Sequence, residues 1–195
     1  MMLDYILNLD RSLFILINSK WTAPWADQFF PFVTDLHKTP LFKFILVPLL
    51  AAIFMWRRGI KKGLTIFLFC LLSVGASDGF GNYALKKTVQ RLRPGDTVGL
   101  EVVNRSPYGG GFSFVSNHAT NMFSFASFTS AIFPLATVPL YGLASIVAYS
   151  RVYNGVHYPA DVICGGLLGM AFGLLFATLC LRLLSRLPQQ GTKSA

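Results

Sequence analysis

The chain has 195 residues, of which 53% are hydrophobic and only 13% are charged. A soluble domain usually carries about 25% charged residues. Together with a mean hydropathy of +0.54, this composition excludes an ordinary soluble domain and predicts an integral membrane protein. The net charge of +9 lies largely in short hydrophilic stretches between apolar segments, and no zinc-finger or RNA-binding pattern is present. We therefore expect a lipid bilayer and an anionic lipid or phosphate as partners, and no nucleic acid.

The N-terminal segment is apolar but interrupted by polar residues. Residues 3–18 carry several of them (Asp4, Asn8, Asp10, Arg11 and Asn18). This pattern predicts an amphipathic interfacial helix, with Trp21 and Trp25 as anchors after it. Residues 26–36 are expected to form a second short helix at the membrane surface. No cleavable signal peptide is expected, because Asp4 comes early and neither a basic leader nor an Ala-x-Ala site is present.

Five apolar segments follow as candidate membrane spans. They cover residues 41–56, 63–85, 117–134, 139–150 and 160–184. The third and fourth are short, since about 20 residues are needed to cross a bilayer core of about 30 Å. The sequence therefore predicts an all-α polytopic membrane helix bundle with five to six transmembrane helices. We expect one domain over residues 1–195, with interfacial helices over 1–38, the bundle over 39–186 and a tail over 187–195.

Several residues inside these segments have two possible roles. Asp78 is costly in hydrocarbon, and a structural hydrogen bond and a functional role are equally open for it. Small residues in the last segment (Gly165, Gly166, Gly169 and Gly173) suit close helix packing. The three cysteines (Cys70, Cys164 and Cys180) lie in apolar runs without metal-ligand spacing, so we expect small hydrophobic side chains within helices.

Polar residues suited to phosphate chemistry form three clusters, of which two flank a polar loop over residues 86–116. Lys86 and Arg93-Pro94 bracket the end of the second span, and a separation of seven residues is about two helical turns, so both cations can point the same way. Ser116-Asn117-His118 begins the third span, where free N–H groups and the positive end of the helix dipole favour an anion.

The third cluster is Ser150–Asp161, at the junction of the last two spans. If this part is helical, His157 and Asp161 share a face and the carboxylate can hold the imidazole in one tautomer. Arg151 offers a planar fork for phosphate. By itself a His-x-x-x-Asp pair is more often structural. Counting crossings places all three clusters at one face of the membrane, slightly recessed because two spans are short.

The three clusters together resemble the motifs of the type 2 phosphatidic acid phosphatase superfamily. Lys86 to Arg93-Pro94 is similar to the first block, Val115–His118 to the second and Ser150-Arg151 to His157 and Asp161 to the third. The resemblance covers about residues 40–184. Val115 replaces a proline and Asn117 a glycine, and neither change removes a catalytic side chain. Asn also tolerates left-handed backbone angles better than most residues.

The resemblance implies a lipid phosphatase that works through a phosphohistidine. His157 would be the nucleophile, Asp161 would orient it, and His118 would act as acid and then as base. The expected phosphate-binding groups are Lys86, Arg93, Ser116, the Asn117 backbone N–H and Arg151. Three basic side chains take the place of a metal, so no metal and no other cofactor is expected. Three further basic residues (Lys87, Arg91 and Arg105) are expected to be solvated or to face headgroups.

The substrate is expected to be a phosphorylated lipid. Small size and the interfacial N-terminal helix look most like bacterial undecaprenyl-diphosphate phosphatases, which makes undecaprenyl diphosphate the leading expectation. A lipid A 1-phosphatase, a phosphatidylglycerophosphate or phosphatidate phosphatase, and a lipid phosphotransferase remain open, as does the oligomeric state. Two non-enzymatic alternatives are a transporter, which the lack of repeats and broken helices disfavours, and a silent lipid-binding scaffold, which the intact His157, Asp161 and His118 disfavour.

The membrane orientation follows from the distribution of basic residues. Seven of them lie opposite the clusters, with no acidic residue (Arg57, Arg58, Lys61, Lys62, Arg182, Arg186 and Lys193). The side of the clusters carries ten, and discounting the six in or beside the site leaves four. The positive-inside rule then predicts a bacterial inner membrane protein whose site faces the periplasm or cell exterior.

Overall fold

The computed structural model describes residues 2–107 and 110–186, and these form helices joined by loops, with no strand among them. The principal helices are α1 (Met2–Ile15), α2 (Pro24–Asp35), α3 (Val47–Arg58), α4 (Ile60–Gly79), α5 (Lys86–Val89), α6 (Asn117–Ile132), α7 (Thr137–Tyr153) and α8 (Pro159–Arg186). Short π-helical and 3-10 segments link them: η1 (Leu16–Lys20), η2 (Leu36–Lys38), η3 (Phe42–Leu46), η4 (Phe80–Leu85), η5 (Pro94–Asp96) and η6 (Pro134–Ala136). The all-helical prediction is confirmed. The predicted tail over 187–195, with Lys193, lies outside the described residues.

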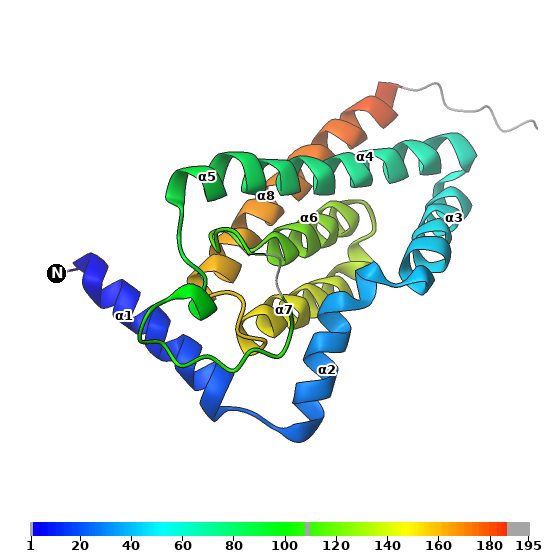
Figure 1. Ribbon diagram of the computed structural model, residues 1–195. Helices are drawn as coiled ribbons and strands as arrows, with labels where there is room; N and C mark the ends of the chain where they lie inside the picture. Colours follow the sequence, from blue (N-terminus) through cyan, green and yellow to red (C-terminus); the bar gives the residue numbers. More distant parts are fainter. Residues whose placement is uncertain (1, 108–109, 187–195) are drawn as a thin grey trace, which may run out of the picture.

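Helix α6 is the centre of the bundle, with α4, α7 and α8 packed around it (Figure 1). The approach of α8 to α6 depends on glycine. A Cβ at Gly169 would collide with the carbonyl oxygen of Thr120, and one at Gly173 would lie 2.5 Å from that of Ser124. Because each backbone occupies the space of the missing side chains, the two helices pack closely at the site end. The glycine pattern read from the sequence is thus confirmed as a packing surface.

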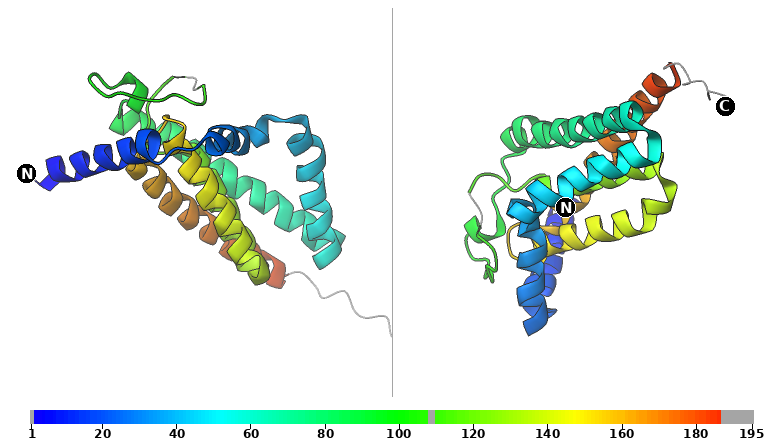
Figure 2. Two further views of the ribbon diagram at one scale, coloured as in Figure 1. Left: turned by 90° about the horizontal axis from the view of Figure 1, so that it is seen from below. Right: turned by 90° about the vertical axis from the view of Figure 1, so that its right-hand side faces the viewer.

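The first two helices lie across one end of this bundle (Figure 2). Most of α1 is exposed, including large apolar side chains such as Tyr5 and Leu9. Asp10 and Phe14 are the exceptions and are buried against the rest of the chain. At the other end, Arg58 donates to the carbonyl oxygen of Ile132 at 2.7 Å and so satisfies the last turn of α6. The loop segments 90–107 and 110–116 cross the same end of the bundle as α1 and α2.

The structure does not confirm the predicted number of membrane spans. Three helical stretches of the described chain are long and apolar enough to cross a membrane: 60–96, 134–153 and 159–186. A fourth results if residues 24–38 and 42–58, which meet at a bend of 55°, act as one broken span. Helix α6 has only 16 residues, and many of its buried residues are Ser and Thr. The prediction of five to six spans is therefore not confirmed, although the membrane-type helical bundle is.

The second predicted span does not continue as a helix to Arg93. After the π-helical segment η4 and the short α5, the helix ends at Gln90, whose φ of 50° and ψ of 35° are left-handed. The chain then extends, and Arg93 has a φ of −72° and a ψ of 159°. The premise that Lys86 and Arg93 share a helical face was therefore wrong. Both nevertheless reach the same pocket, because the extended segment folds back over the end of the bundle.

Candidate active site

A polar pocket of about 260 Å³ opens at the end of the bundle where all three sequence clusters meet. Its lining residues are mostly basic or amide side chains: Lys38, Asn82, Lys86, Arg93, Pro107, Asn117, His118, Arg151 and His157. These residues come from the C-terminal ends of α4–α5 and α7, the N-terminal end of α6, and the loops beside them. The three clusters therefore lie at one end of the fold, as the sequence predicted.

His157 is not part of a helix, so the premise that it shares a helical face with Asp161 was wrong. Helix α8 begins at Pro159, and Asp161 occupies its third position. The Asp161 Oδ2 accepts a hydrogen bond from the backbone N–H of Tyr158 at 2.9 Å, as the third residue of a capping box does. The same oxygen lies 3.5 Å from His157 Nδ1. The cap thus places the carboxylate behind the imidazole, at ion-pair distance rather than in a short hydrogen bond.

The other ring nitrogen of His157 faces a cation. Arg93 Nη1 lies 3.3 Å from His157 Nε2 and also donates to the carbonyl oxygen of Val156 at 2.9 Å. A guanidinium has only donors, so Nε2 is the acceptor and the ring hydrogen is on Nδ1, toward Asp161. Burial lowers the pKa of His157 to about 4, and the Asp161 carboxylate opposes that shift. Near neutral pH the ring is therefore neutral, with a lone pair on the pocket side.

Lys86 and Asn117 are held in place by one carboxylate. Asp78 Oδ2 accepts from Asn82 Nδ2 at 2.9 Å, and Asn82 Oδ1 accepts from Lys86 Nζ at 3.1 Å. Asp78 Oδ1 accepts from Asn117 Nδ2 at 2.6 Å and from Asn121 Nδ2 at 2.9 Å. Asp78 does not itself line the pocket, and these bonds connect it to two lining residues, Asn82 and Asn117. Its polar contacts therefore favour the structural alternative left open by the sequence.

Arg151 and His118 line the pocket, and each has a side-chain nitrogen that the described residues leave without a partner. Arg151 Nη1 donates to Thr34 Oγ1 at 2.7 Å, but its Nε has no partner within the described chain. His118 Nε2 is likewise buried without a partner among these residues. Buried polar atoms without partners are rare, and several converging on one pocket indicate a ligand with many acceptors.

Another predicted residue, Ser116, differs from expectation. Ser116 precedes α6 as its N-cap, but its hydroxyl is fully buried, has no partner among the described residues and does not line the polar pocket. The structure therefore does not bring Ser116 into the pocket with the other phosphate-binding candidates. Its backbone N–H instead donates to the Asp161 carbonyl oxygen at 3.0 Å, which ties the starts of α6 and α8 together.

The basic residues expected to face solvent or headgroups also behave differently. Arg91 forms ion pairs with Asp10 at 2.5 Å and with Asp161 at 2.8 Å, and is mostly buried. Arg105 pairs with Asp27 at 2.6 Å and donates to the carbonyl oxygens of Asn18 and Tyr153. The solvated role was thus wrong for both. Lys87 is the exception, since it is exposed and its ammonium lies 5.2 Å from the centroid of the Tyr83 ring.

Residues 34–38, outside every sequence motif, complete the site. The His37 ring lies edge to face against the His118 ring, with centroids 5.1 Å apart, and His37 Nδ1 is 2.9 Å from the Thr34 carbonyl oxygen. Lys38 lines the pocket as a fourth cation and pairs with Asp35 at 2.7 Å. No signal in the sequence linked this segment to residues more than 75 positions away, because only the packing of α2 against α7 brings it there.

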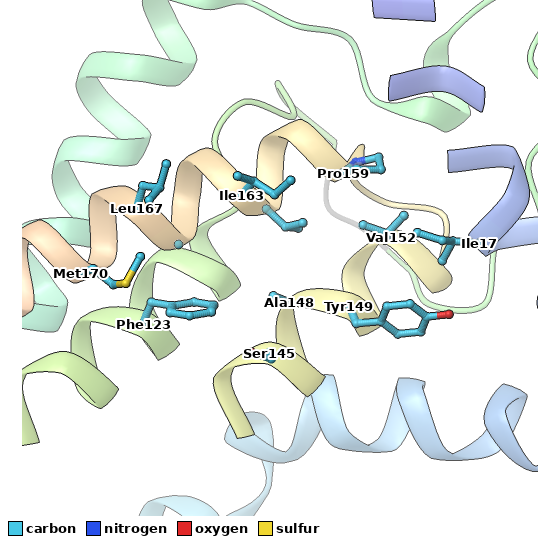
Figure 3. A pocket seen from close by; sticks show the side chains of 12 residues that line it. Ile17, Phe123, Ser145, Ala148, Tyr149, Val152, Pro159, Ile163, Leu167 and Met170 are labelled. Carbon is cyan, nitrogen blue, oxygen red and sulfur yellow. The ribbon is translucent and has the colours of Figure 1, made fainter. Parts of the chain in front are cut away.

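A second pocket, of about 370 Å³, is almost wholly apolar and shares no lining residue with the polar one. It lies between α7 and α8, with single contributions from η1 and α6 (Figure 3). Its lining residues are Ile17, Phe123, Ser145, Ala148, Tyr149, Val152, Pro159, Val162, Ile163, Gly166, Leu167 and Met170. Such a surface suits hydrocarbon, not phosphate, so the chemistry belongs to the polar pocket.

Comparisons with known proteins agree with the geometry. The PAP2 superfamily model matches residues 63–184. A lipid A 4'-phosphatase of Porphyromonas gingivalis is 30% identical over 177 residues, covering 88% of this chain and 72% of that protein. An undecaprenyl-diphosphatase of Sulfolobus acidocaldarius is 30% identical over 133 residues, covering 65% of this chain and 59% of that protein.

A solved structure shows the same fold. It is the transmembrane PAP2 type phosphatidylglycerolphosphate phosphatase from Bacillus subtilis, with a TM-score of 0.63 and 25% identity, covering 96% of this chain and 90% of that one. The residues that the PAP2 superfamily model matches include four that line the polar pocket: Lys86, Arg93, His118 and His157. The chain belongs to the PAP2 superfamily and is a membrane lipid phosphatase.

Proposed function

We propose that the polar pocket hydrolyses a lipid phosphate or diphosphate through a phosphohistidine on His157. The observation that carries this proposal is the convergence of the buried His157, the partly buried His118 and four basic side chains on one small pocket. Three of those cations, Lys86, Arg93 and Arg151, would neutralise the non-bridging oxygens of the phosphoryl group. Positioning and electrostatic stabilisation of this kind supply most of the protein's contribution to phosphoryl transfer.

In the first step His157 Nε2 attacks phosphorus. The bond between phosphorus and the leaving oxygen breaks, its electron pair stays on that oxygen, and a proton from His118 neutralises it. In the free site burial and the nearby Arg151 cation lower the pKa of His118 to about 2, so His118 would be protonated only when the bound phosphate anion offsets these effects. Arg93, which faces Nε2 in the free site, then donates to the phosphoryl oxygens instead. The Asp161 carboxylate stabilises the positive charge that develops on the imidazole, as the acidic member of a catalytic triad does.

In the second step a water molecule replaces the leaving group. His118, now neutral, takes a proton from the water while its oxygen attacks phosphorus, and the phosphorus–nitrogen bond breaks. Phosphate leaves, and His157 Nε2 regains its lone pair. The backbone N–H of Asn117, in the first turn of α6, and the positive end of the helix dipole favour the anion throughout.

We further propose undecaprenyl diphosphate as the substrate, with undecaprenyl phosphate and phosphate as products. Lys38 supports this proposal because it adds a fourth cation to the three of the motifs, which matches the greater negative charge of a diphosphate. The matched undecaprenyl-diphosphatase supports it as well. The pocket would face the periplasm or cell exterior of a bacterial inner membrane, where the basic turn at Arg57–Lys62 would be cytoplasmic.

A lipid A phosphatase is the second candidate. The observation that favours it is the match to a lipid A 4'-phosphatase, which covers a larger share of this chain than the undecaprenyl-diphosphatase does. A phosphate on a glucosamine headgroup needs the same histidines and cations. It differs in requiring room above the pocket for a bulky sugar, which the residues near Pro107 would have to provide.

The test is phosphate release by the purified full chain from a panel of lipids. The panel contains undecaprenyl diphosphate, undecaprenyl phosphate, lipid A, phosphatidylglycerophosphate and phosphatidate in one detergent, with His157→Ala as the control. The leading proposal expects the highest kcat/KM for undecaprenyl diphosphate, with a selective loss in Lys38→Ala. Preference for lipid A would favour the second candidate. No release from any lipid, or full activity in His157→Ala, would overturn the assignment of the pocket.

A further inference from the structure

Helix α1 carries an acidic side chain, Asp10, that is buried on an otherwise largely exposed helix. Asp10 is only 6% exposed, although the apolar residues around it on α1, such as Leu9 and Leu13, are open to the outside. A carboxylate is rarely buried unless it is paired, because the loss of hydration is costly. The partners of Asp10 therefore show what the burial achieves.

Those partners lie next to the proposed nucleophile. Asp10 Oδ1 accepts from the backbone N–H of Ala160 at 2.8 Å, in the first turn of α8. Asp10 Oδ2 accepts from Arg91 Nη2, and Arg91 Nη1 donates to Asp161 Oδ1 at 2.8 Å. The other oxygen of Asp161, Oδ2, accepts from the backbone N–H of Tyr158 and lies 3.5 Å from His157 Nδ1. A continuous chain of charged contacts thus runs from α1 to the imidazole.

Arg91 is held between these two carboxylates from several directions. Its guanidinium lies 3.9 Å from the centroid of the Tyr158 ring, and the same ring packs against Phe14 of α1 with centroids 5.4 Å apart. Two donors on one planar fork, stacked on an aromatic face, fix the orientation of both carboxylates more firmly than a lysine would. The Asp161 oxygen that faces His157 has less freedom as a result.

We propose that Asp10 and Arg91 are positioning residues for the phosphatase reaction, which orient Asp161 and set the charge that His157 experiences. This inference rests on the proposed role of His157. It assigns to α1 a contribution to catalysis, since α1 supplies Asp10 and stacks Phe14 on the ring that supports Arg91. Asp161 remains the residue that faces the nucleophile, and the other two act through it.

The two residues have opposite charges, so their removal has opposite electrostatic effects. Loss of the Arg91 cation makes the Asp161–His157 pair more basic, and the pH at which His157 becomes protonated rises. Loss of the Asp10 anion leaves Arg91 to act on Asp161 alone, and that pH falls. The other charged or titratable groups near the pair are unchanged by either substitution: Lys86, Arg93, His118, Arg151 and Cys164.

The test compares Arg91→Gln, Arg91→Lys and Asp10→Asn with the matched control Arg11→Gln, an exposed charge on the same helix. The probe is dioctanoyl phosphatidate in detergent, with kcat and KM measured from pH 4 to 9. Both neutral variants, Arg91→Gln and Asp10→Asn, lose charge-assisted hydrogen bonds that orient Asp161, so we expect kcat to fall roughly tenfold while KM stays within about twofold. Arg91→Lys should restore the pH profile but only part of kcat, since it keeps the charge and loses the fork.

A second readout does not depend on turnover. With ¹⁵N-labelled histidine, NMR follows the protonation of His157, whose signal is identified by its loss in His157→Gln. The midpoint should rise in Arg91→Gln, fall in Asp10→Asn and stay unchanged in Arg11→Gln. Opposite shifts in a protein that releases phosphate from none of the panel lipids would retain the coupling and reject the proposed function. Unshifted midpoints with unchanged kcat, or reduced thermal stability as the only effect, would overturn the proposal.

Discussion

Asn117 at the mouth of the polar pocket donates its side-chain amide to Asp78 of α4 at 2.6 Å. The same carboxylate reaches Lys86 through Asn82, so one acidic group positions two residues of the pocket lining. These contacts explain why a carboxylate is tolerated in an apolar helix. Asp78 is paired with three amides rather than left in hydrocarbon.

Asp78→Asn should keep a measurable fraction of activity. An asparagine retains one acceptor for the amide network but loses the charge, so we expect kcat/KM to fall about tenfold, mainly through a higher KM for the lipid phosphate. Steady-state kinetics on the wild type and on Asp78→Asn and Asp78→Leu measure this, and the leucine variant should lose more. A loss in Asp78→Asn as complete as in His157→Ala would show that Asp78 takes part in the chemistry.

Substitution of His157 and of His118 should block different steps of the reaction. His157→Ala removes the nucleophile, so neither turnover nor a phosphoenzyme is expected. His118→Ala removes the proton donor, so turnover should fall by about 100-fold or more, while a substrate with a good leaving group still phosphorylates His157. Rapid quenching with a ³²P-labelled substrate measures the phosphoenzyme. Label trapped in His157→Ala would reverse the assignment.

The low pKa of His157 predicts an acid limb in the pH profile. Burial lowers this pKa from 6.5 to about 4, so the neutral nucleophile persists below pH 6.5 and activity should be lost as the pH falls toward 4.

The same pKa shift of His157 affects folding stability. An unfolded His157 takes up its proton near pH 6.5 but the folded one only near pH 4, so the folding stability contributed by this residue is complete above 6.5 and declines across that window. Thermal unfolding in detergent at several pH values checks this, and His157→Asn should have a shallower slope.

Catalysis should continue in excess EDTA. The four cations of the pocket supply the charge that a divalent metal supplies elsewhere, so we expect kcat within about twofold of the untreated enzyme. Phosphate release is measured before and after chelation, with the lipid also freed of metal. Activity that disappears with EDTA and returns with Mg²⁺ would contradict this prediction, provided that the metal does not act on the lipid aggregate.

The orientation of the pocket is testable by cysteine labelling of intact cells with an impermeant reagent. All three native cysteines are unpaired, so they are first replaced. Val98, in the loop at the site end, is 99% exposed, and Leu135, between α6 and α7, is 94% exposed. We expect Val98→Cys to be labelled and Leu135→Cys to react only after permeabilisation. The reverse pattern would place the pocket in the cytoplasm and exclude a substrate located in the outer leaflet of the membrane.

The sequence by itself determined the class of the protein and predicted most of the residues that line the polar pocket. Hydrophobic composition and apolar segment length predict a helical membrane bundle, because a bilayer imposes helices of limited length. The order of Lys86, Arg93, His118, Arg151 and His157 at the ends of those segments predicts one shared site, since helices that alternate direction return their ends to the same face. These predictions depend only on local pattern and on the count of crossings.

Tertiary structure decided how the groups are held. The positions of Arg93 and His157 depend on a helix stop at Gln90 and on the cap of α8, which spacing along an assumed helix did not predict. The contacts of Asp10 with Arg91, and of His37 with His118, join segments about 80 residues apart. No periodic pattern records such contacts, because they arise from the packing of α1 and α2 across the end of the bundle. That packing turned Arg91, expected to be a solvated charge, into a buried partner of Asp161.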